Sequence, residues 1–403
     1  MDRTETRRRW LAACAGTTVA GLAGCLEDDP SEAETDDRNT TDEGTTPSDS
    51  ETDTTVAADA WPMYGVDARN TGHHPDATGP KGEVEVKWTL EADDSFVSSP
   101  VIADGVLYAS SRDGYLYAVD VDSGELEWKT ELWFSLSYSP VVADGTVYAS
   151  GRDTLYALES NTSDVLWERE IERGEWKHAT ALRGRIYITD GNRAIALDRQ
   201  DDTLEWDYDV LSNSSDVPAI TESSVFVGTS DQLHAIDIET GNREWRFENE
   251  NEAGMTISEP ATDEETVYIG AQDNNLYAVD SETGEGVWRF EQSTGSIYAS
   301  PSIAGDTVYC ASLDSHLYAI DIQSGTEKWS ASADNQIGNK PAIADGVVYV
   351  GSVDDHVYAF DAENGDELWS FETEDGIFAG PIVLDGVTYV PSSDGRIYAL
   401  EEK

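Results

Sequence analysis

The sequence predicts an all-β chain, an eight-bladed β-propeller made of four-stranded blades. The first observation is a hairpin, "LYAVDVDSGELEW" (Leu116–Trp128), in which apolar and polar residues alternate on both sides of a turn. Asp120 can begin that turn through its side chain, and Gly124 can adopt the positive φ that the turn requires. The second observation is that this hairpin recurs along the whole chain.

The third observation is the spacing of the tryptophans that close the hairpins. Successive closing tryptophans are separated by 40, 39, 39, 39, 43, 41 and 40 residues. Two further strands precede each hairpin, as in "SSPVIADGVLYASSRDG" from Ser98, so the repeating unit holds four strands. A period of about 40 residues with four short strands is typical of a propeller blade. The closing tryptophans are Trp88, Trp128, Trp167, Trp206, Trp245, Trp288, Trp329 and Trp369.

The two ends of the chain carry complementary parts of one blade. The first tryptophan strand, "VEVKWTL" from Val84, has no unit before it, and the last unit, which ends "IYALEEK" from Ile397, has no tryptophan strand after it. Pairing the two would complete the eighth blade and remove the open edges of the ring. We therefore expect the N-terminal strand to close the last blade.

Residues 1–25 read as a targeting signal. Arg7–Arg9 precede an apolar run, Leu11–Leu22, which is too short to span a bilayer, and Cys25 follows it. The order resembles a twin-arginine export signal joined to a lipobox, which implies lipidation of Cys25. We therefore expect export by the twin-arginine route and anchoring through Cys25 to the outer face of the cell membrane.

Residues 26–60 form an acidic tether rich in Thr and Ser, which we expect to be disordered. The segment holds one basic residue, Arg38, and from Leu26 to Ala60 no aromatic residue. Such a composition cannot bury enough apolar surface to offset the entropy lost on ordering. The propeller is therefore expected to occupy residues 61–403.

The charge excludes several classes of partner. With 81 acidic and 25 basic residues the formal net charge is -56, which repels nucleic acid and anionic lipid. A surface so acidic and so poor in lysine indicates a halophilic protein, kept soluble in concentrated salt, where self-repulsion is screened. The alternative is a moderately acidic secreted protein.

The hairpin also resembles a known repeat. Its pattern, Ala118, Asp120, Gly124 and Trp128 at fixed spacing, resembles the tryptophan-docking repeat of the quinoprotein dehydrogenase (PQQ-like) β-propeller family. "WPMYGVDARNTG" from Trp61 is similar to the segment that opens that domain. The resemblance implies that each closing tryptophan packs on the neighbouring blade. Ser163 and Asp202 replace the turn glycine in the second and third hairpins.

Enzymes of that family bind a quinone over a calcium ion, and many cover it with a disulfide between adjacent cysteines. The cysteines here, Cys14, Cys25 and Cys310, are not adjacent. "DVDSGE" from Asp120 resembles a calcium loop, but its ligand spacing is incomplete. We therefore expect no metal and no cofactor, with PQQ and calcium as the alternative.

In the same family the loops that enter the innermost strands line the mouth of the central channel. Here those loops are rich in aromatic residues and hold a few lysines, a composition that suits a partner segment or a small ligand. The alternative interpretation of these residues is ordinary loop packing. The candidate mouth residues are Trp133, Tyr138, Trp176, Lys177, His178, Glu259, Tyr298, Asn339, Lys340 and Phe378.

The sequence thus predicts a lipid-anchored, extracytoplasmic scaffold that binds a protein or a small molecule without catalysis, as a monomeric domain. No nucleophile motif and no phosphate-binding loop stands out. Two other functions stay open: a quinone-dependent dehydrogenase, and a ligand-sensing domain that serves a separate signalling protein.

Overall fold

The computed structural model describes residues 56–133, 135–171, 176–210, 214, 217–248 and 258–403. The predicted signal, with Cys25, and residues 26–55 of the predicted tether lie outside these residues. The last five residues of that tether, 56–60, pack on the propeller: Ala60 is buried, and the carbonyl oxygen of Ala57 accepts a hydrogen bond from Ala60 N at 3.1 Å. No helix in the described part of the chain is long and apolar enough to cross a membrane.

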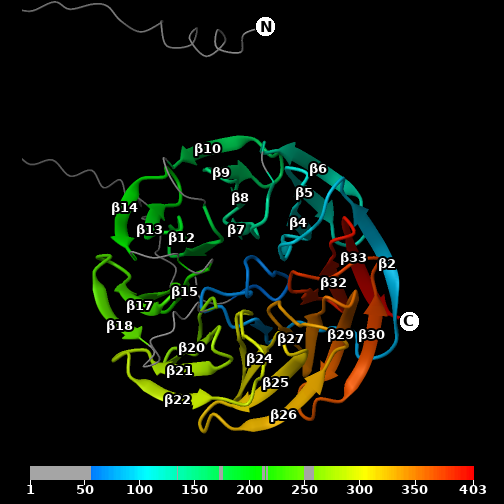
Figure 1. The fold of residues 1–403 in the computed structure, drawn as a ribbon. Coiled ribbons are helices and arrows are strands. Elements are labelled where there is room, and N and C mark those ends of the chain that lie inside the picture. The colour runs from blue at the N-terminus through cyan, green and yellow to red at the C-terminus, as the bar shows by residue number, and fades with distance from the viewer. Residues whose placement is uncertain (1–55, 134, 172–175, 211–213, 215–216, 249–257) are drawn as a thin grey trace, which may run out of the picture. The chain divides into compact units, whose positions relative to one another are not determined.

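Residues 56–403 build eight antiparallel sheets arranged around a centre, which confirms the predicted eight-bladed propeller (Figure 1). Blade 1 consists of β3 (Val101–Ala103), β4 (Val106–Ser110), β5 (Tyr115–Asp120) and β6 (Leu126–Glu131), and blade 2 of β7 (Val141–Ala143), β8 (Thr146–Ser150), β9 (Thr154–Glu159) and β10 (Val165–Glu170). Blade 3 consists of β11 (Ala179–Leu182), β12 (Arg185–Thr189), β13 (Arg193–Asp198) and β14 (Leu204–Asp209), and blade 4 of β15 (Ala219–Ile220), β16 (Ser224–Gly228), β17 (Gln232–Asp237) and β18 (Arg243–Glu248).

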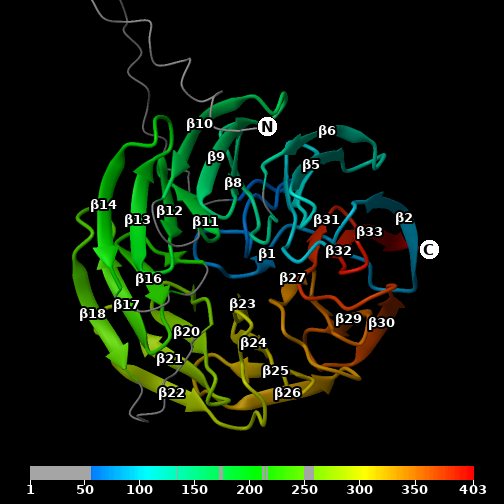
Figure 2. The ribbon, with the colours of Figure 1, turned by 45° about the horizontal axis from the view of Figure 1, so that its top comes forward.

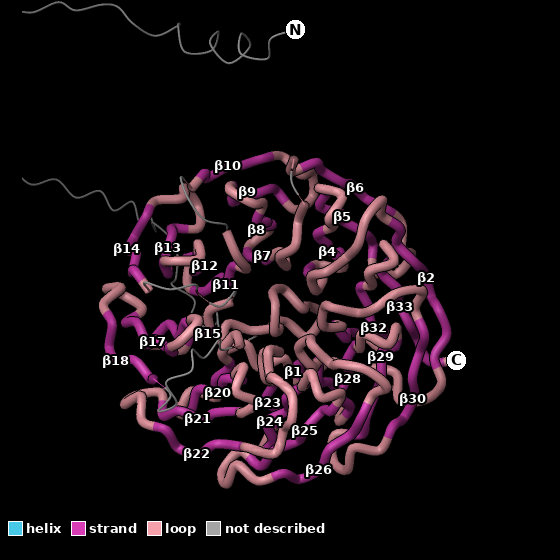
Figure 3. Tube along the Cα trace, in the orientation of Figure 1, coloured by secondary structure: helices cyan, strands magenta, loops and turns pink. Residues whose placement is uncertain are grey.

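Blades 5 to 8 continue the same order, and the first strand of each blade is innermost (Figure 3). Blade 5 consists of β19 (Ala261–Thr262), β20 (Thr266–Gly270), β21 (Leu276–Asp280) and β22 (Gly286–Phe290), and blade 6 of β23 (Ser302–Ala304), β24 (Thr307–Ala311), β25 (His316–Asp321) and β26 (Glu327–Ser332). Blade 7 consists of β27 (Ala342–Ala344), β28 (Val347–Gly351), β29 (His356–Asp361) and β30 (Glu367–Glu372), and blade 8 of β31 (Ile382–Leu384), β32 (Val387–Pro391), β33 (Arg396–Glu402) and β2 (Val84–Glu91).

The eighth blade is closed by the N-terminal strand, as predicted. β2 pairs antiparallel with β33, from Val84 opposite Glu402 to Glu91 opposite Arg396. Figure 1 shows the two strands side by side although they come from opposite ends of the domain. Because β2 supplies the outermost strand of a sheet that otherwise belongs to the C-terminus, the ring has no open seam.

In blades 1 to 7 the hairpin between the third and fourth strands docks on one tryptophan of the preceding blade. Trp88 of blade 8 donates from Nε1 to the carbonyl oxygen of Val121 in blade 1 at 2.9 Å. A Cβ added to the turn glycine, Gly124 (φ 71°), would lie 2.6 Å from the Trp88 ring, so glycine is required there. Ser163 and Asp202 take the same positive φ, at 61° and 57°, in the two hairpins without glycine. The equivalent bonds run from Trp128 to Ser160, Trp167 to Arg199, Trp206 to Ile238, Trp245 to Ser281, Trp288 to Ile322 and Trp329 to Ala362.

Residues 61–80, here called the strap, cross the centre of the ring before β2 begins (Figures 1 and 2). Strap carbonyl oxygens accept hydrogen bonds from the backbone of innermost strands, and β1 (His73–His74) pairs in parallel with β27. Trp61 and Val66 of the strap are almost fully buried. The acceptor and donor pairs are Trp61 and Ile102, Pro62 and Val142, Ala68 and Ile220, Arg69 and Thr262, Thr71 and Ile303, and Gly72 and Ile343.

Candidate functional site at the channel mouth

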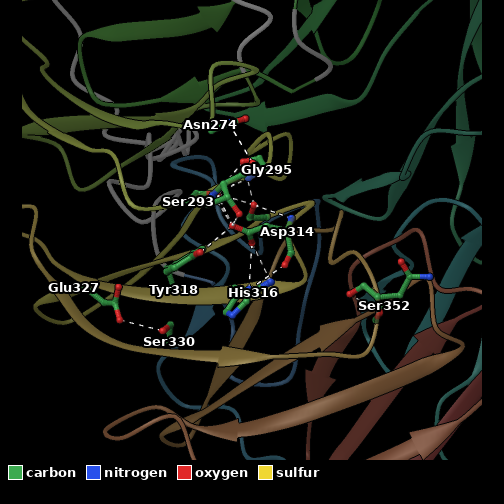
Figure 4. A network of polar contacts seen from close by, with 12 residues as sticks. Asn274, Ser293, Gly295, Asp314, His316, Tyr318, Glu327, Ser330 and Ser352 are labelled. Carbon is green, nitrogen blue, oxygen red and sulfur yellow. Dashed lines mark hydrogen bonds and ion pairs between the residues drawn. The ribbon is translucent and has the colours of Figure 1, made fainter.

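The mouth is formed by the loops that lead from the outermost strand of one blade to the innermost strand of the next. In blade 6, Asp314 lies in the turn between β24 and β25. Its carboxylate accepts hydrogen bonds from Thr294 N, in the loop that enters blade 6, at 2.7 Å and from the Tyr318 hydroxyl at 2.9 Å (Figure 4). Backbone N–H groups of the loops entering blades 1, 7 and 8 are held in the same way by Asp113, Asp354 and Asp394. One side of the mouth is therefore built from a repeated, rigid loop.

The loops entering blades 2 to 5 hold most of the predicted mouth residues. Trp133, in the loop entering blade 2, is 74% exposed and has a φ of 69°. For an L-residue with a bulky side chain a left-handed backbone costs about 1–2 kcal/mol. An exposed aromatic residue in a strained conformation makes this position a candidate for a function.

An aromatic cluster joins two of these loops to the strap. The His178 ring lies 5.1 Å, centroid to centroid, from both Tyr138 and Tyr64, and Tyr64 belongs to the strap. Ser139 N donates to Nδ1 of His178 at 3.0 Å, so that nitrogen is the acceptor in the neutral ring. Lys177 Nζ lies 5.9 Å from the centroid of Tyr138. The cluster gives this part of the mouth an aromatic floor with a cation at its edge.

Lys340 is buried at the channel centre and holds the strap. Its ammonium donates to the carbonyl oxygens of Asn70 at 2.7 Å and Pro301, and to the Ser300 hydroxyl at 3.1 Å. These three acceptors match its three donors. Burial lowers the pKa of Lys340 to about 7, although the carboxylates of Asp67 and Glu259 oppose that shift.

Three of the predicted mouth residues serve the core instead. Trp176 is fully buried: its backbone N–H donates to the carbonyl oxygen of Arg152 and its indole Nε1 to that of Arg169, and its side chain fills the joint between neighbouring blades that a single apolar residue plugs elsewhere. Asn339 is buried and donates to the carbonyl oxygens of Gly351 and Ile377. With Lys340, these residues offer no surface to a partner. The residues that fill the equivalent plug position are Phe96, Leu136, Ile297, Ile337 and Ile377, all fully buried.

Of the other predicted mouth residues, all but His178 are at least partly accessible. Phe378 is 54% exposed and Tyr298 is 37% exposed, and they lie in the loops entering blades 8 and 6. Tyr138, Lys177 and Glu259 are half-buried. His178 is buried beneath the tyrosines. Among the described residues of the mouth, Trp133, Phe378 and Tyr298 are thus the exposed aromatic ones.

Comparison with protein families matches residues 82–176, 153–296, 251–339 and 314–403 to the family described as outer membrane protein assembly factor BamB. The chain belongs to this family. No curated protein matches the chain. The propeller of this BamB family member is the repeat array that the tryptophan spacing predicted, and the matches begin just before β2.

Solved structures share the fold at low sequence identity. Quinohemoprotein alcohol dehydrogenase from Comamonas testosteroni has a TM-score of 0.74 at 14% identity, over 86% of this chain and 81% of its own. BamB from Moraxella catarrhalis has a TM-score of 0.66 at 17% identity, over 79% of this chain and 100% of its own. The computationally designed Ika8 protein has a TM-score of 0.69 at 17% identity, over 77% of this chain and 98% of its own. These likenesses establish the fold alone.

The described residues at the channel centre do not fit a tricyclic quinone. The cavity beside Lys340, lined by Tyr64 and Gly65 of the strap, has a volume of about 10 Å³, enough for about one water molecule. All three Lys340 donors are engaged by protein oxygens. No group of three or more His, Cys, Asp or Glu side chains within the described ranges could hold a metal ion.

Proposed function

We propose that this BamB family member is a non-catalytic, protein-binding scaffold outside the cytoplasm, and that it binds its partner through the channel mouth. The observation that carries the proposal is the exposed, backbone-strained Trp133. Tryptophan and tyrosine dominate the binding energy of protein interfaces because they bury large areas with few rotatable bonds.

The distribution of exposed apolar side chains supports the mouth as the binding face. Among the described residues, the aromatic ones with large exposed fractions are Trp133, Tyr298 and Phe378, and all three lie in mouth loops. The exposed aliphatic ones, such as Leu166 at 55%, lie on the outermost strands. Aliphatic residues scattered singly on a surface need no partner.

Export and anchoring are part of the same proposal. We propose that residues 1–25 direct export by the twin-arginine route, that Cys25 carries the lipid, and that the domain sits on the outer face of the membrane. The family description, which names an outer membrane protein assembly factor, supports a role outside the cytoplasm. A flexible tether over residues 26–55 would let the domain range about 30 Å from its anchor.

The proposal has two further parts: the domain binds no quinone, and the protein is adapted to high salt. The small cavity and the saturated Lys340 argue against a cofactor at the channel centre. A net charge of -56 on 403 residues favours a halophilic host. A quinone-dependent dehydrogenase would instead require stoichiometric cofactor in protein purified from that host.

A pull-down with crosslinking from native membranes at high salt tests the scaffold. Trp133→Ala should lose one specific partner, because truncating an interface tryptophan costs about 2 kcal/mol or more of binding energy. Leu166→Ala, a change at an exposed apolar residue on an outer strand, is the control and should keep that partner. An identical partner set for Trp133→Ala and wild type, or stoichiometric quinone in the same preparation, would contradict the proposal.

A further inference from the structure

A cavity of about 280 Å³ lies between the strap and the innermost strands of blades 2 to 4, and Glu264 in the turn after β19 of blade 5 also lines it. Met63 of the strap, Leu182 of blade 3 and Ile220 of blade 4 give it mostly apolar walls. Asp144 and Glu222, in the turns that follow β7 and β15, also line it, so it opens at the end of the channel opposite the mouth. Cavities of a few hundred Å³ with apolar walls and a few polar groups are typical small-molecule sites.

The cavity lies where the repeat is broken. At the strap-facing position of the innermost strand, seven blades carry Ile, Val or Thr, but blade 3 carries Ala181. Among the described residues no backbone hydrogen bond joins the strap to Ala181, whereas six of the other seven residues at this position donate to strap carbonyl oxygens. The small side chain of Ala181, together with the missing hydrogen bond between its backbone and the strap, leaves the cavity open. The residues at the equivalent positions are Ile102, Val142, Ile220, Thr262, Ile303, Ile343 and Val383.

The charges around the cavity favour a cation. Its two guanidinium groups are already paired, Arg199 with Asp144, and Arg69 with Asp67 and Glu264 at 3.3 Å each. The lining holds four carboxylates, these three and Glu222, against the two arginines, and Glu222 is itself paired at 3.7 Å with Arg183, which lies outside the lining. When Arg183 is counted, four carboxylates face three guanidinium groups, which leaves a formal charge of -1. The whole chain, at -56, adds a field that repels anions.

We infer that this cavity binds a small, mostly apolar organic cation. The apolar body would lie against Leu182, Ile220 and Met63, whose flexible thioether can adapt to its shape. The ammonium group would face Glu222 and Glu264 at the rim. The site is separate from the mouth and does not depend on the scaffold role, because the strap lies between the two.

The test is calorimetric titration of the purified full chain with three ligands that share a six-carbon chain: hexylammonium, 1-hexanol and hexanoate. At the lowest salt concentration at which the chain stays folded, hexylammonium should bind roughly three- to tenfold more tightly than hexanol, and hexanoate most weakly. Added salt should reduce the difference between hexylammonium and hexanol. Hexanoate binding as tightly as hexylammonium, or binding by none of the three, would overturn the inference.

Substitutions separate the cavity from other binding places. Ala181→Ile restores the side chain that the repeat carries elsewhere, so it should weaken hexylammonium binding by roughly tenfold or more by filling the cavity, with an equal or higher melting temperature. Leu204→Ile, on the exposed outer strand of the same blade, should leave binding unchanged. Unchanged affinity in a folded Ala181→Ile protein would place the ligand elsewhere.

A second variant tests the inference independently, in case Ala181→Ile fails to fold. The double change Glu222→Gln, Glu264→Gln alters exposed rim carboxylates, so the fold should persist. Its preference for hexylammonium over hexanol should fall by roughly threefold or more, because two of the four lining carboxylates are neutralised. An unchanged preference in this variant would exclude the rim carboxylates and contradict the assignment.

Discussion

The indole Nε1 of Trp369 donates to the carbonyl oxygen of Pro80 at 2.8 Å, and the Tyr349 hydroxyl donates to the same oxygen at 3.1 Å. In every other blade the tryptophan finds its acceptor in the hairpin of the next blade. Blade 8 has no such hairpin because its last two strands, β33 and β2, come from opposite ends of the chain. The strap therefore supplies the docking oxygen at the closure as well as crossing the channel.

We expect Trp369 to contribute to stability mainly through its buried ring and partly through this hydrogen bond. Trp369→Ala should lower the free energy of unfolding by about 3–5 kcal/mol. Trp369→Phe keeps an aromatic ring but removes one of the two donors to the Pro80 carbonyl oxygen, so it should cost about 1–3 kcal/mol. Denaturant unfolding at constant high salt measures both. Equal losses for the two variants would mean that the hydrogen bond, not the buried ring, decides the closure, contrary to this expectation.

The turn glycines allow a matched comparison. Gly325 has a φ of 67°, and an added Cβ would lie 2.6 Å from Trp288 of the preceding blade. Gly346 has a φ of 77°, and an added Cβ would meet nothing within 4 Å. Gly346→Ala should therefore cost only the backbone term of about 1–2 kcal/mol, and Gly325→Ala should cost about 1–3 kcal/mol more. Similar melting temperatures for the two variants would refute the proposed packing of glycine on tryptophan.

Stability should depend on pH through Lys340. In the folded state its pKa is lowered to about 7 from 10.5, so between these values the unfolded chain binds more protons than the folded chain. The free energy of unfolding should therefore rise with pH across this window, whereas below it Lys340 should contribute no pH dependence. Denaturation midpoints at several pH values, compared with Lys340→Met, isolate the contribution. A difference between wild type and variant that stays constant from neutral to alkaline pH would argue against the lowered pKa.

Anchoring should depend on Cys25. Two acyl chains stabilise membrane binding by about 0.8 kcal/mol per buried methylene, so the lipidated chain should stay in the membrane fraction after a salt wash. Cys25→Ser should release the domain, while Cys310→Ser, which changes a buried strand residue, should leave the fractionation unchanged. If Cys25→Ser also stays in the membrane fraction, the proposed lipid anchor is wrong.

The repeat was sufficient to predict the ring. Period-two alternation, turn glycines and regularly spaced tryptophans are local signals, and the unpaired strand at each end of the chain, β2 and β33, required the shared blade. The strap's full course was not predictable, because it depends on backbone contacts with strands far apart in sequence. The burial of Lys340 follows from that course, so a lysine predicted to lie at the mouth surface instead holds the strap.

The sequence was sufficient to predict which of the two tryptophans in the mouth loops is exposed and which is buried. Trp133 and Trp176 both lie in mouth loops, yet one is exposed and the other is fully buried. Most loops place one apolar residue, such as Leu136 or Ile337, four positions before the proline of the innermost strand, and that residue plugs the joint between blades. The loop of Trp133 already has Leu136 as its plug, whereas the loop entering blade 3 has Trp176 in that role.

Site-specific photocrosslinking tests the scaffold proposal most directly. A photoreactive amino acid replaces Trp133, or Leu166 as the control, and the full-length protein is irradiated in native membranes at high salt. The account predicts one specific protein adduct from position 133, since an exposed aromatic anchor should lie within an interface, and none from position 166. Adducts from position 166 alone, or no adduct from position 133 in folded, membrane-bound protein, would contradict the channel mouth as the binding face.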